Sequence, residues 1–209
     1  MYTRIAIITP TIGRPSLRRC VESVMAQISH IHRHIVVGDG PQEPWVKSFC
    51  ESRGVLYHEL PTKQGDFGAH ARNFALDFVE NNLKPDYIVF LDDDNELLMS
   101  YTYNIDETAR LNNNPPLLYQ PILHSGKFDT FYKILPATDE IPSNGDWDSL
   151  NGIFRSDIIK GVRWEKEYNH DFKFALDAKE LAGTNYIKVK GINAIHHVSW
   201  DTYDAAVKG

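Results

Sequence analysis

The sequence has few of the residues that build disulfide scaffolds, nucleic-acid surfaces or membrane spans. It contains two cysteines, Cys20 and Cys50, which fits a reducing compartment better than a disulfide framework. Acidic residues outnumber basic ones by 28 to 22 and no run of Lys and Arg occurs, so no nucleic-acid partner is expected. No stretch approaches the roughly 18 apolar residues of a membrane helix, and no signal peptide is recognisable at the start. We therefore expect a soluble, cytoplasmic protein with no membrane segment.

What the sequence does contain is a regular alternation of apolar runs and amphipathic segments over its first hundred residues. Strands are predicted at 5–8, 34–37, 55–59 and 87–91, and helices at 16–28, 44–52 and from 68 to about 82. Strand–helix alternation predicts an α/β fold with a mostly parallel sheet and right-handed crossovers. The length of 209 residues suits one domain with a substantial core.

The pattern changes after residue 94. An antiparallel pair is expected over 117–123 and 127–135, turning at Ser125 and Gly126, and a helix over 169–182. Two final strands are expected at 186–190 and 192–198. We therefore predict a small antiparallel C-terminal part attached to the sheet, with no linker that divides the chain.

Three consecutive acids, Asp92, Asp93 and Asp94, follow directly after the apolar strand 87–91. The carboxyl ends of parallel strands are where open α/β folds bind ligands. Like charges repel unless a cation lies between them, so a divalent metal ion bound to a diphosphate is a natural partner. The alternative is a solvated acidic turn. Polar segments also follow the two earlier strands, at 9–14 and at Asp39, and are expected at the same sheet edge.

Four segments, in this order, resemble the GT-A nucleotide-sugar glycosyltransferases, and within them family 2. They are Ile8-Thr9-Pro10-Thr11 with Arg14, Val36-Val37-Gly38-Asp39-Gly40, Gly65 followed by Ala71-Arg72-Asn73-Phe74-Ala75, and Phe90-Leu91-Asp92-Asp93-Asp94, which is similar to the D-x-D motif. Each motif alone is unspecific, but the ordered set over residues 1 to about 100 is specific. The second half matches loosely, through His170-Asp171 and His196-His197. The small single-domain form also resembles glycosyltransferase domains encoded by some large algal viruses.

This sequence departs from the family pattern at two positions. A Gly precedes Asp39 where the family often has a second Asp, and His170 stands where a Glu often precedes the catalytic base. Neither change removes an essential group.

The resemblance implies a GT-A fold over 1–209, with a nucleotide-binding half at 1–100 and an acceptor-binding half at 101–209. It implies an inverting transferase that uses Mn²⁺ or Mg²⁺ to move a sugar from a UDP-sugar donor to a hydroxyl of a glycan or glycoprotein. Asp171 is expected to be the general base that takes the proton of that hydroxyl.

The resemblance also assigns donor and metal contacts. Asp94 is expected to bind the metal, Asp92 to hold the ribose or a metal-bound water, and Asp39 to read the uracil edge. His196 or His197 is expected to be a late metal ligand, and only one of them, because neighbouring strand residues face opposite sides. The remaining donor contacts are expected from Thr9, Pro10, Thr11, Arg14, Gly65, Arg72, Asn73 and Asp93.

Each of these assignments has a structural alternative. Asp39 also suits a turn before glycine, Arg72 a local ion pair, and Asp171 a helix cap. For the whole chain the alternatives are a catalytically inactive sugar-nucleotide or glycan-binding module and a sugar-nucleotide nucleotidyltransferase. The latter expects a glycine-rich basic loop after the first strand, and residues 11–15 contain one glycine.

Overall fold

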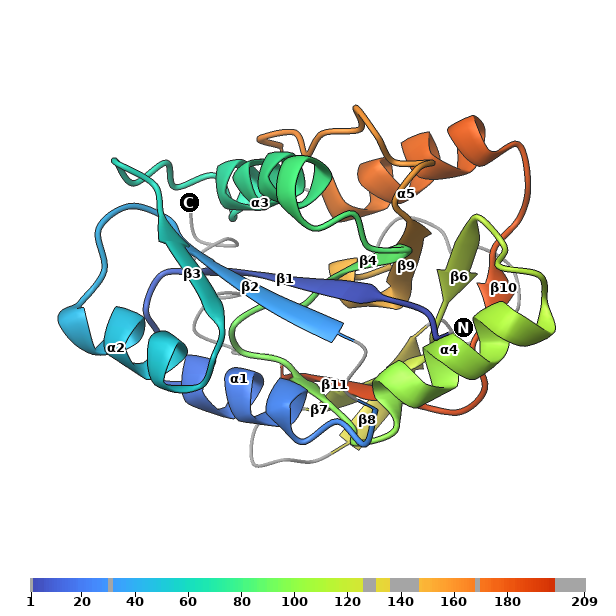
Figure 1. The fold of residues 1–209 in the computed structure, drawn as a ribbon, viewed down its shortest axis with the longest axis horizontal. Coiled ribbons are helices and arrows are strands. Elements are labelled where there is room, and N and C mark those ends of the chain that lie inside the picture. Colours follow the sequence, from blue (N-terminus) through green and yellow to red (C-terminus); the bar gives the residue numbers. More distant parts are fainter. Residues whose placement is uncertain (1, 30–31, 126–130, 136–146, 168–169, 198–209) are drawn as a thin grey trace.

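The computed structural model describes residues 2–29, 32–125, 131–135, 147–167 and 170–197. Within them a seven-stranded sheet has the order β10-β6-β9-β4-β1-β2-β3 (Figure 1). Its strands are β1 (Ile5–Thr11), β2 (His32–Gly38), β3 (Leu56–Glu59), β4 (Tyr87–Phe90), β6 (Leu117–Tyr119), β9 (Gly152–Arg155) and β10 (Ile187–Lys188). β1 is parallel to both its neighbours, β2 and β4, whereas β9 is antiparallel to β4 and β6. The predicted α/β fold with a mostly parallel sheet is confirmed.

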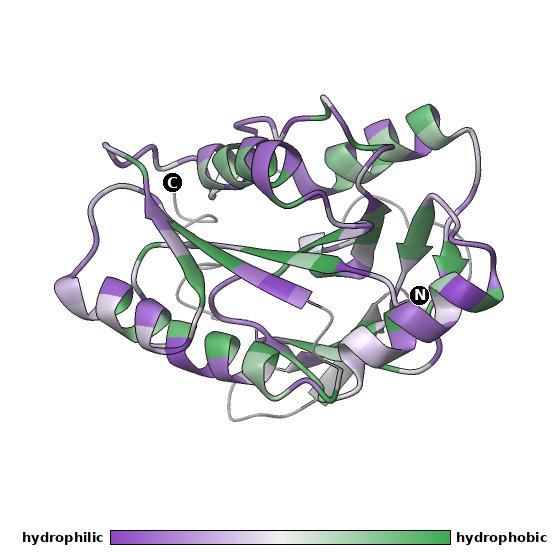
Figure 2. Ribbon diagram, in the orientation of Figure 1, coloured by the Kyte–Doolittle hydropathy of each residue, from purple (hydrophilic) through white to green (hydrophobic). Residues whose placement is uncertain are grey.

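Helices cover both faces of this sheet. They are α1 (Leu17–Met25), α2 (Pro44–Ser52), α3 (Ala69–Asn82), α4 (Tyr101–Leu111) and α5 (His170–Ala182). In Figure 1, α3 and α5 lie on one side of the sheet and α1, α2 and α4 on the other. The residues of β1 and β4 are buried, which explains their uninterrupted apolar runs, and Figure 2 shows a mostly hydrophobic centre.

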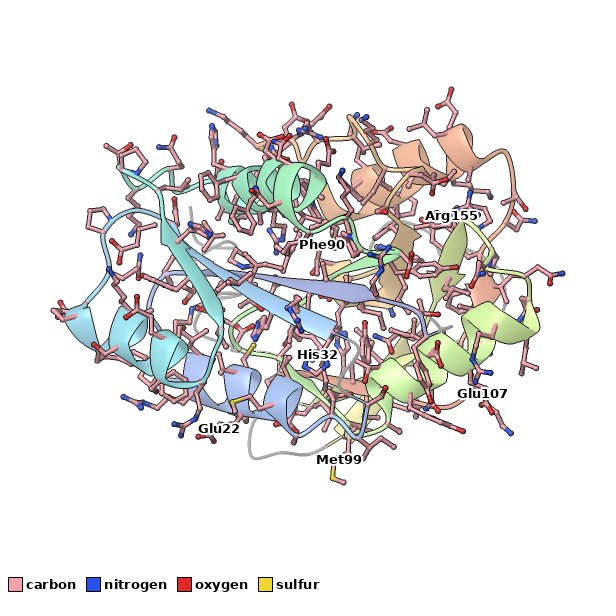
Figure 3. All side chains as sticks on the ribbon, viewed as in Figure 1. Glu22, His32, Phe90, Met99, Glu107 and Arg155 are labelled. Atoms are coloured by element: carbon pink, nitrogen blue, oxygen red, sulfur yellow. The ribbon has the colours of Figure 1, made fainter. Side chains whose placement is uncertain are left out.

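Alternate residues of each strand pack against opposite helical layers. In β1, Ile8 belongs to the core formed with α3 and α5, and Ile7 to the core formed with α1 and α4. Phe90 of β4 lies edge-on to Trp164 and Phe174, with ring centroids 4.8 and 5.3 Å apart, and Figure 3 labels it beneath the helices. Burial of one such side chain contributes roughly 1.5–3 kcal/mol. This aromatic cluster therefore fixes α5 over the sheet.

A smaller sheet has the order β5-β11-β7-β8 within the described residues. Its strands are β5 (Glu96–Leu97), β7 (Ile122–Ser125), β8 (Phe131–Leu135) and β11 (Ala194–His197). β11 is antiparallel to β5 and parallel to β7, with His196 opposite His124. β5 begins two residues after Asp94. Its pairing with β11 therefore brings Ala194–His197 close to the three acids that follow β4.

The elements that differ from expectation lie in the second half of the chain. The strand expected over 117–123 is divided between the two sheets, because Pro121 lacks the N–H needed to continue a ladder. The antiparallel pair therefore consists of β7 and β8, and β7 is also parallel to β11. Helix α4 is not among the elements expected from the sequence, although Tyr101, Ile105 and Ala109 are buried at helical spacing.

Both halves of the chain contribute to the large sheet, because β6, β9 and β10 extend the sheet begun by β1 to β4. The turn expected at Gly126 and the end of the strand expected over 192–198 lie outside the described residues. In the part of the chain that the structure describes, no helix combines the length and apolar character needed to cross a bilayer.

Candidate functional site

A cavity of about 400 Å³ lies at the sheet edge where β1, β2 and β4 end. Its lining comes from the end of β1, the segments after these strands, the loop before α3, α3 itself, the first residue of α5 and β11. The residues are Pro10, Thr11, Ile12, Arg14, Asp39, Lys63, Gly65, Phe67, Gly68, Arg72, Asp92, Asp93, Asp94, His170 and His196. The polar segments that follow separate strands thus meet around one cavity, as a parallel sheet requires.

The acids after β4 are held by groups from the end of β1 and the segment that follows it. Asp93 is 4% exposed and accepts a hydrogen bond from the Thr11 hydroxyl at 2.6 Å. The Arg14 guanidinium lies 3.3 Å from Asp93 Oδ1 and donates to Asp94 Oδ2 at 2.5 Å. Arg14 therefore bridges two of the three carboxylates across 80 residues of sequence.

Arg72 provides the second positive charge of the cavity. It is 2% exposed, and its guanidinium donates to the Asp92 carboxylate and to the carbonyl of Phe67, the latter at 2.8 Å. The same group lies 4.5 Å above the ring of Trp164, a cation–π contact. Gly68, at φ +85°, allows this packing, because a Cβ there would lie 3.1 Å from Arg72 Nη1 and 2.9 Å from the Pro10 side chain. Arg72 is therefore part of the cavity wall and its ion pair is with the acidic motif.

The pKa values of the acids reflect their unequal pairing. Burial tends to raise the pKa of Asp92, but Arg72 and His196 outweigh it and hold that pKa below its usual range. Burial raises the pKa of Asp94 to about 6, and the neighbouring Asp92 adds to the rise while Arg14 opposes it. Three carboxylates face two guanidinium groups, so a further cation near Asp94 is electrostatically favoured.

Asp39 holds the loop before α3. Its two carboxylate oxygens accept hydrogen bonds from the backbone N–H of Gln64 at 2.8 Å and of Gly65 at 3.0 Å. Gly65 has φ +64°, a conformation that favours glycine. Asp39 is 5% exposed and lines the cavity, so it fixes this loop as well as facing the cavity.

The two late histidines face different surroundings, as alternation along a strand predicts. His196 lines the cavity. The ring of His197 instead has Nδ1 3.0 Å from the Ser125 hydroxyl, and its backbone N–H donates to Asn95. His196 is therefore the histidine that shares the cavity with Asp92 and Asp94.

Asp171 lies in the first turn of α5, next to the cavity-lining His170. One carboxylate oxygen accepts from the Phe172 N–H at 2.9 Å, so the side chain also takes part in the start of the helix. Burial, together with the nearby Asp148 carboxylate, raises the pKa of Asp171 to about 6. A carboxylate with this pKa is ionised at pH 7 and is a better base than an exposed aspartate.

A family model matches residues 6–136, more than half of the chain, and it describes glycosyl transferase family 2. This chain belongs to that family. No curated protein matches the family 2 chain at a significant level.

Several solved structures share the fold of the family 2 chain. Residues 1–349 of TarS from S. aureus have a TM-score of 0.74 and 15% identity, covering 96% of this chain and 62% of that one. The same TarS segment in complex with UDP-GlcNAc has a TM-score of 0.72 and 14% identity, covering 94% and 59%. Its complex with UDP has a TM-score of 0.68 and 14% identity, covering 98% and 63%. The family 2 chain has the GT-A fold and spans about six-tenths of these TarS chains.

Four of the residues expected at the site do not line the cavity. The Thr9 hydroxyl is buried 2.9 Å from His34 Nε2, and the Asn73 amide exchanges two hydrogen bonds with the backbone of Trp164. His197 and Asp171 are the other two. In contrast, Lys63, Phe67 and His170 line the cavity of this family 2 chain and were not expected to contact the donor. Of these three, only His170 could have been found from the sequence, because it directly precedes the predicted base Asp171.

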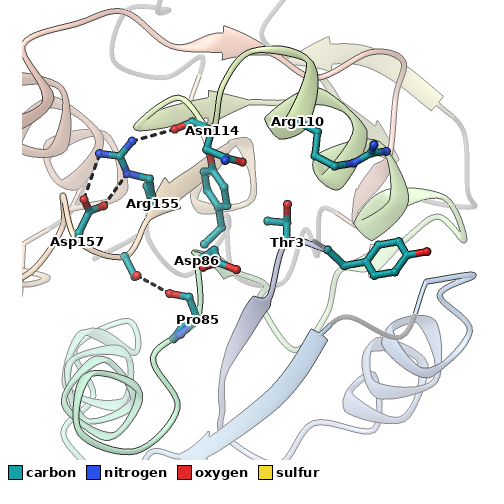
Figure 4. Close-up of a pocket in the computed structure, with 10 residues that line it drawn as sticks. Thr3, Pro85, Asp86, Arg110, Asn114, Arg155 and Asp157 are labelled. Atoms are coloured by element: carbon teal, nitrogen blue, oxygen red, sulfur yellow. Dashed lines mark hydrogen bonds and ion pairs between the residues drawn. The ribbon is translucent and has the colours of Figure 1, made fainter.

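A second cavity, of about 360 Å³, lies at the amino end of β1 and β4 (Figure 4). Its charged groups are already paired. Arg155 donates to Asp157 at 2.7 Å and to the carbonyl of Asn114, Arg110 lies 3.1 Å from Asp106, and Asp86 pairs with Arg4. This cavity therefore presents no uncompensated charge comparable to the acidic cluster.

Proposed function

We propose that this family 2 chain is an inverting, metal-dependent glycosyltransferase that moves a sugar from a UDP-sugar to a hydroxyl of a glycan or glycoprotein. The observation that carries the proposal is the cluster of Asp92, Asp93 and Asp94, which meets Arg14 and Arg72 in one cavity at the carboxyl end of the sheet. Both signs of charge are needed to bind a metal ion and a diphosphate together.

The donor half of the proposal rests on Asp39 and the two arginines. Each oxygen of the Asp39 carboxylate retains acceptor capacity beyond the loop amide that it binds, and the uracil imide N–H is a matching donor. A guanidinium group suits phosphate oxygens, and Arg14 is part-exposed beside Asp94. The fold is shared with TarS chains whose structures contain UDP-GlcNAc and UDP.

The residues present fit a hard divalent cation in kind. Asp94 and His196 both line the cavity, and carboxylate oxygen and imidazole nitrogen are ligands that Mn²⁺ accepts. In the described residues no three His, Cys, Asp or Glu side chains form a ready metal site. Mg²⁺-type sites often use one or two carboxylates and complete their coordination with substrate phosphates. We infer that Asp94 and His196 would hold the ion together with the diphosphate, where it would act as a Lewis acid toward the leaving group.

Asp171 is the proposed base for the transfer step. The acceptor oxygen attacks the anomeric carbon, the bond from that carbon to the diphosphate oxygen breaks with its electron pair leaving on UDP, and the hydroxyl proton passes to Asp171. A single displacement inverts the anomeric configuration. The position of Asp171 at the start of α5, beside the cavity but not in its lining, is compatible with contact to an acceptor and not to the donor.

The proposal is tested with a panel of nucleoside-diphosphate sugars and Mn²⁺, measuring release of free nucleoside diphosphate. We expect slow release from at least one UDP-sugar, its loss in Asp94→Asn, and its retention in the matched control Asp157→Asn at the far edge of the sheet. Binding of UDP-sugars with no release, with or without acceptors, would identify a binding module instead. Pyrophosphate release from UTP and a sugar 1-phosphate would identify a nucleotidyltransferase.

A further inference from the structure

A polar cluster built from three separate segments lies behind the cavity wall. β11 is parallel to β7 with His196 opposite His124, and the two rings meet edge to face with centroids 4.4 Å apart. His196 Nδ1 is 3.0 Å from His124 Nε2 and 3.3 Å from Asp148 Oδ2. One ring nitrogen of His196 is thus flanked by two polar groups, while the same residue lines the cavity.

The Asp148 carboxylate is held firmly in place. Its Oδ1 accepts from the Leu150 N–H at 2.8 Å, and its backbone N–H donates to Asn151 Oδ1 at 2.8 Å, which together form a capping box at the start of a short 3₁₀ turn, Ser149–Asn151. Asn151 is buried and its amide donates to the Gln120 carbonyl. These contacts leave Oδ2 as the oxygen directed at His196.

The position of this carboxylate connects the two parts of the site. His196 contributes to the low pKa of Asp92 and opposes the rise in the pKa of Asp94, and Asp148 adds to the rise that burial causes in the pKa of Asp171. The cluster is therefore electrostatically coupled both to the acids that line the cavity and to the acid proposed to act on the acceptor.

We propose that Asp148 is a positioning residue that keeps the ring proton of His196 on Nδ1 and so leaves the Nε2 lone pair for the cavity. A carboxylate can only accept, so an Nδ1 that lies 3.3 Å from it is favoured as the protonated nitrogen, and His124 Nε2, 3.0 Å from the same Nδ1, is then a second acceptor for that proton. A lone pair at Nε2 suits a metal ion, whereas it repels a phosphate oxygen. The inference that the Nε2 lone pair binds a metal ion rests on the proposed function, whereas the inference that the ring proton lies on Nδ1 does not.

Two substitutions separate this role from a structural one. Asp148→Asn keeps an oxygen for the Leu150 N–H but turns an NH₂ group toward His196, which favours a lone pair on Nδ1 and a proton on Nε2. Asp148→Ser keeps the N-cap oxygen and removes the atom that faces His196. Since both residues are good N-caps, the fold should persist, and the Tm of each variant verifies this. Asp157→Asn makes the same chemical change at the far edge of the sheet and is the control.

The decisive readout is the tautomer of His196, measured by long-range ¹H–¹⁵N NMR of the metal-free protein at pH 8, with His196→Gln to assign the ring. We expect a proton on Nδ1 in the unmodified protein and in Asp157→Asn, and on Nε2 in Asp148→Asn. An unchanged tautomer in Asp148→Asn would overturn the proposal.

A second readout is UDP affinity with and without Mn²⁺. Loss of a group that orients a metal-binding histidine typically weakens metal affinity by about 10–100-fold. We expect that loss in the Mn²⁺-dependent part of UDP binding for Asp148→Asn and Asp148→Ser, with metal-free UDP affinity unchanged. Equal Mn²⁺ dependence in all proteins would refute the link to the metal. If the unmodified protein shows no Mn²⁺ dependence, the proposed function fails, while the NMR result still decides where the proton lies.

Discussion

Lowering the pH from 7.5 to 5 should destabilise the protein through His34, a buried histidine of β2. His34 is 6% exposed, its Nε2 lies 2.9 Å from the Thr9 hydroxyl, and among the described residues Nδ1 has no hydrogen-bond partner. Burial lowers the pKa of His34 to about 3, and His32 contributes to the shift. In the unfolded chain the pKa of a histidine is about 6.5.

The sign follows from these two values. Because the folded pKa is the lower one, the unfolded state takes up a proton first as the pH falls, and stability is lost below about pH 6.5 and down to about pH 3. Each pH unit in this window costs up to about 1.4 kcal/mol, so the loss at pH 5 is about 2 kcal/mol. That is a large part of the roughly 5–15 kcal/mol by which domains are stable.

The measurement is the free energy of urea unfolding at pH 7.5, 6 and 5 for the unmodified protein and His34→Gln. Gln retains a group that can bond the Thr9 hydroxyl but does not titrate. The unmodified protein should lose about 2 kcal/mol more than His34→Gln between pH 7.5 and 5. His58→Gln is the control, because the less buried His58 packs between Phe74 and Phe78 and should show a smaller effect. A difference between the two proteins that does not vary with pH would refute the reasoning.

Three predictions concern the proposed donor and acceptor sites. UDP should raise the Tm more with Mn²⁺ than with chelator, and Asp94→Asn should abolish the metal-dependent part; an unchanged metal response would remove Asp94 from the site. Asp39→Ala should weaken UDP binding about tenfold or more, since a hydrogen bond to a charged group contributes roughly 1.5–3 kcal/mol. Because Asp39 also holds the loop amides, the informative quantity is the preference for UDP over GDP and ADP, which the variant should lose. Asp171→Asn should leave UDP affinity and Tm nearly unchanged while slowing transfer by a factor on the order of 10²–10⁴, and the unmodified enzyme should lose transfer activity below about pH 6, where Asp171 becomes protonated. Normal transfer by this variant, or a product that retains the anomeric configuration of the donor, would exclude the inverting mechanism through Asp171.

The sequence by itself determined the first half of the fold and the place of the cavity. Apolar runs such as 87–91 and helices with one apolar face are local patterns, and each forms its element from nearby residues. A parallel sheet then puts the carboxyl ends of its strands at one edge, so Asp39 and the acids at 92–94 had to meet there. No long-range contact is needed to infer that meeting.

Only the tertiary structure decided which of these groups pair and which turn away. Arg14 reaches Asp94 across 80 residues, and Asn73 is used to hold the backbone of Trp164. His196 stands beside His124 because strand β11 pairs with β7, and beside Asp148 because the turn before β9 packs against β11. Such contacts depend on how distant elements pack, since the partner of a polar side chain is set by burial and geometry and not by its neighbours in sequence.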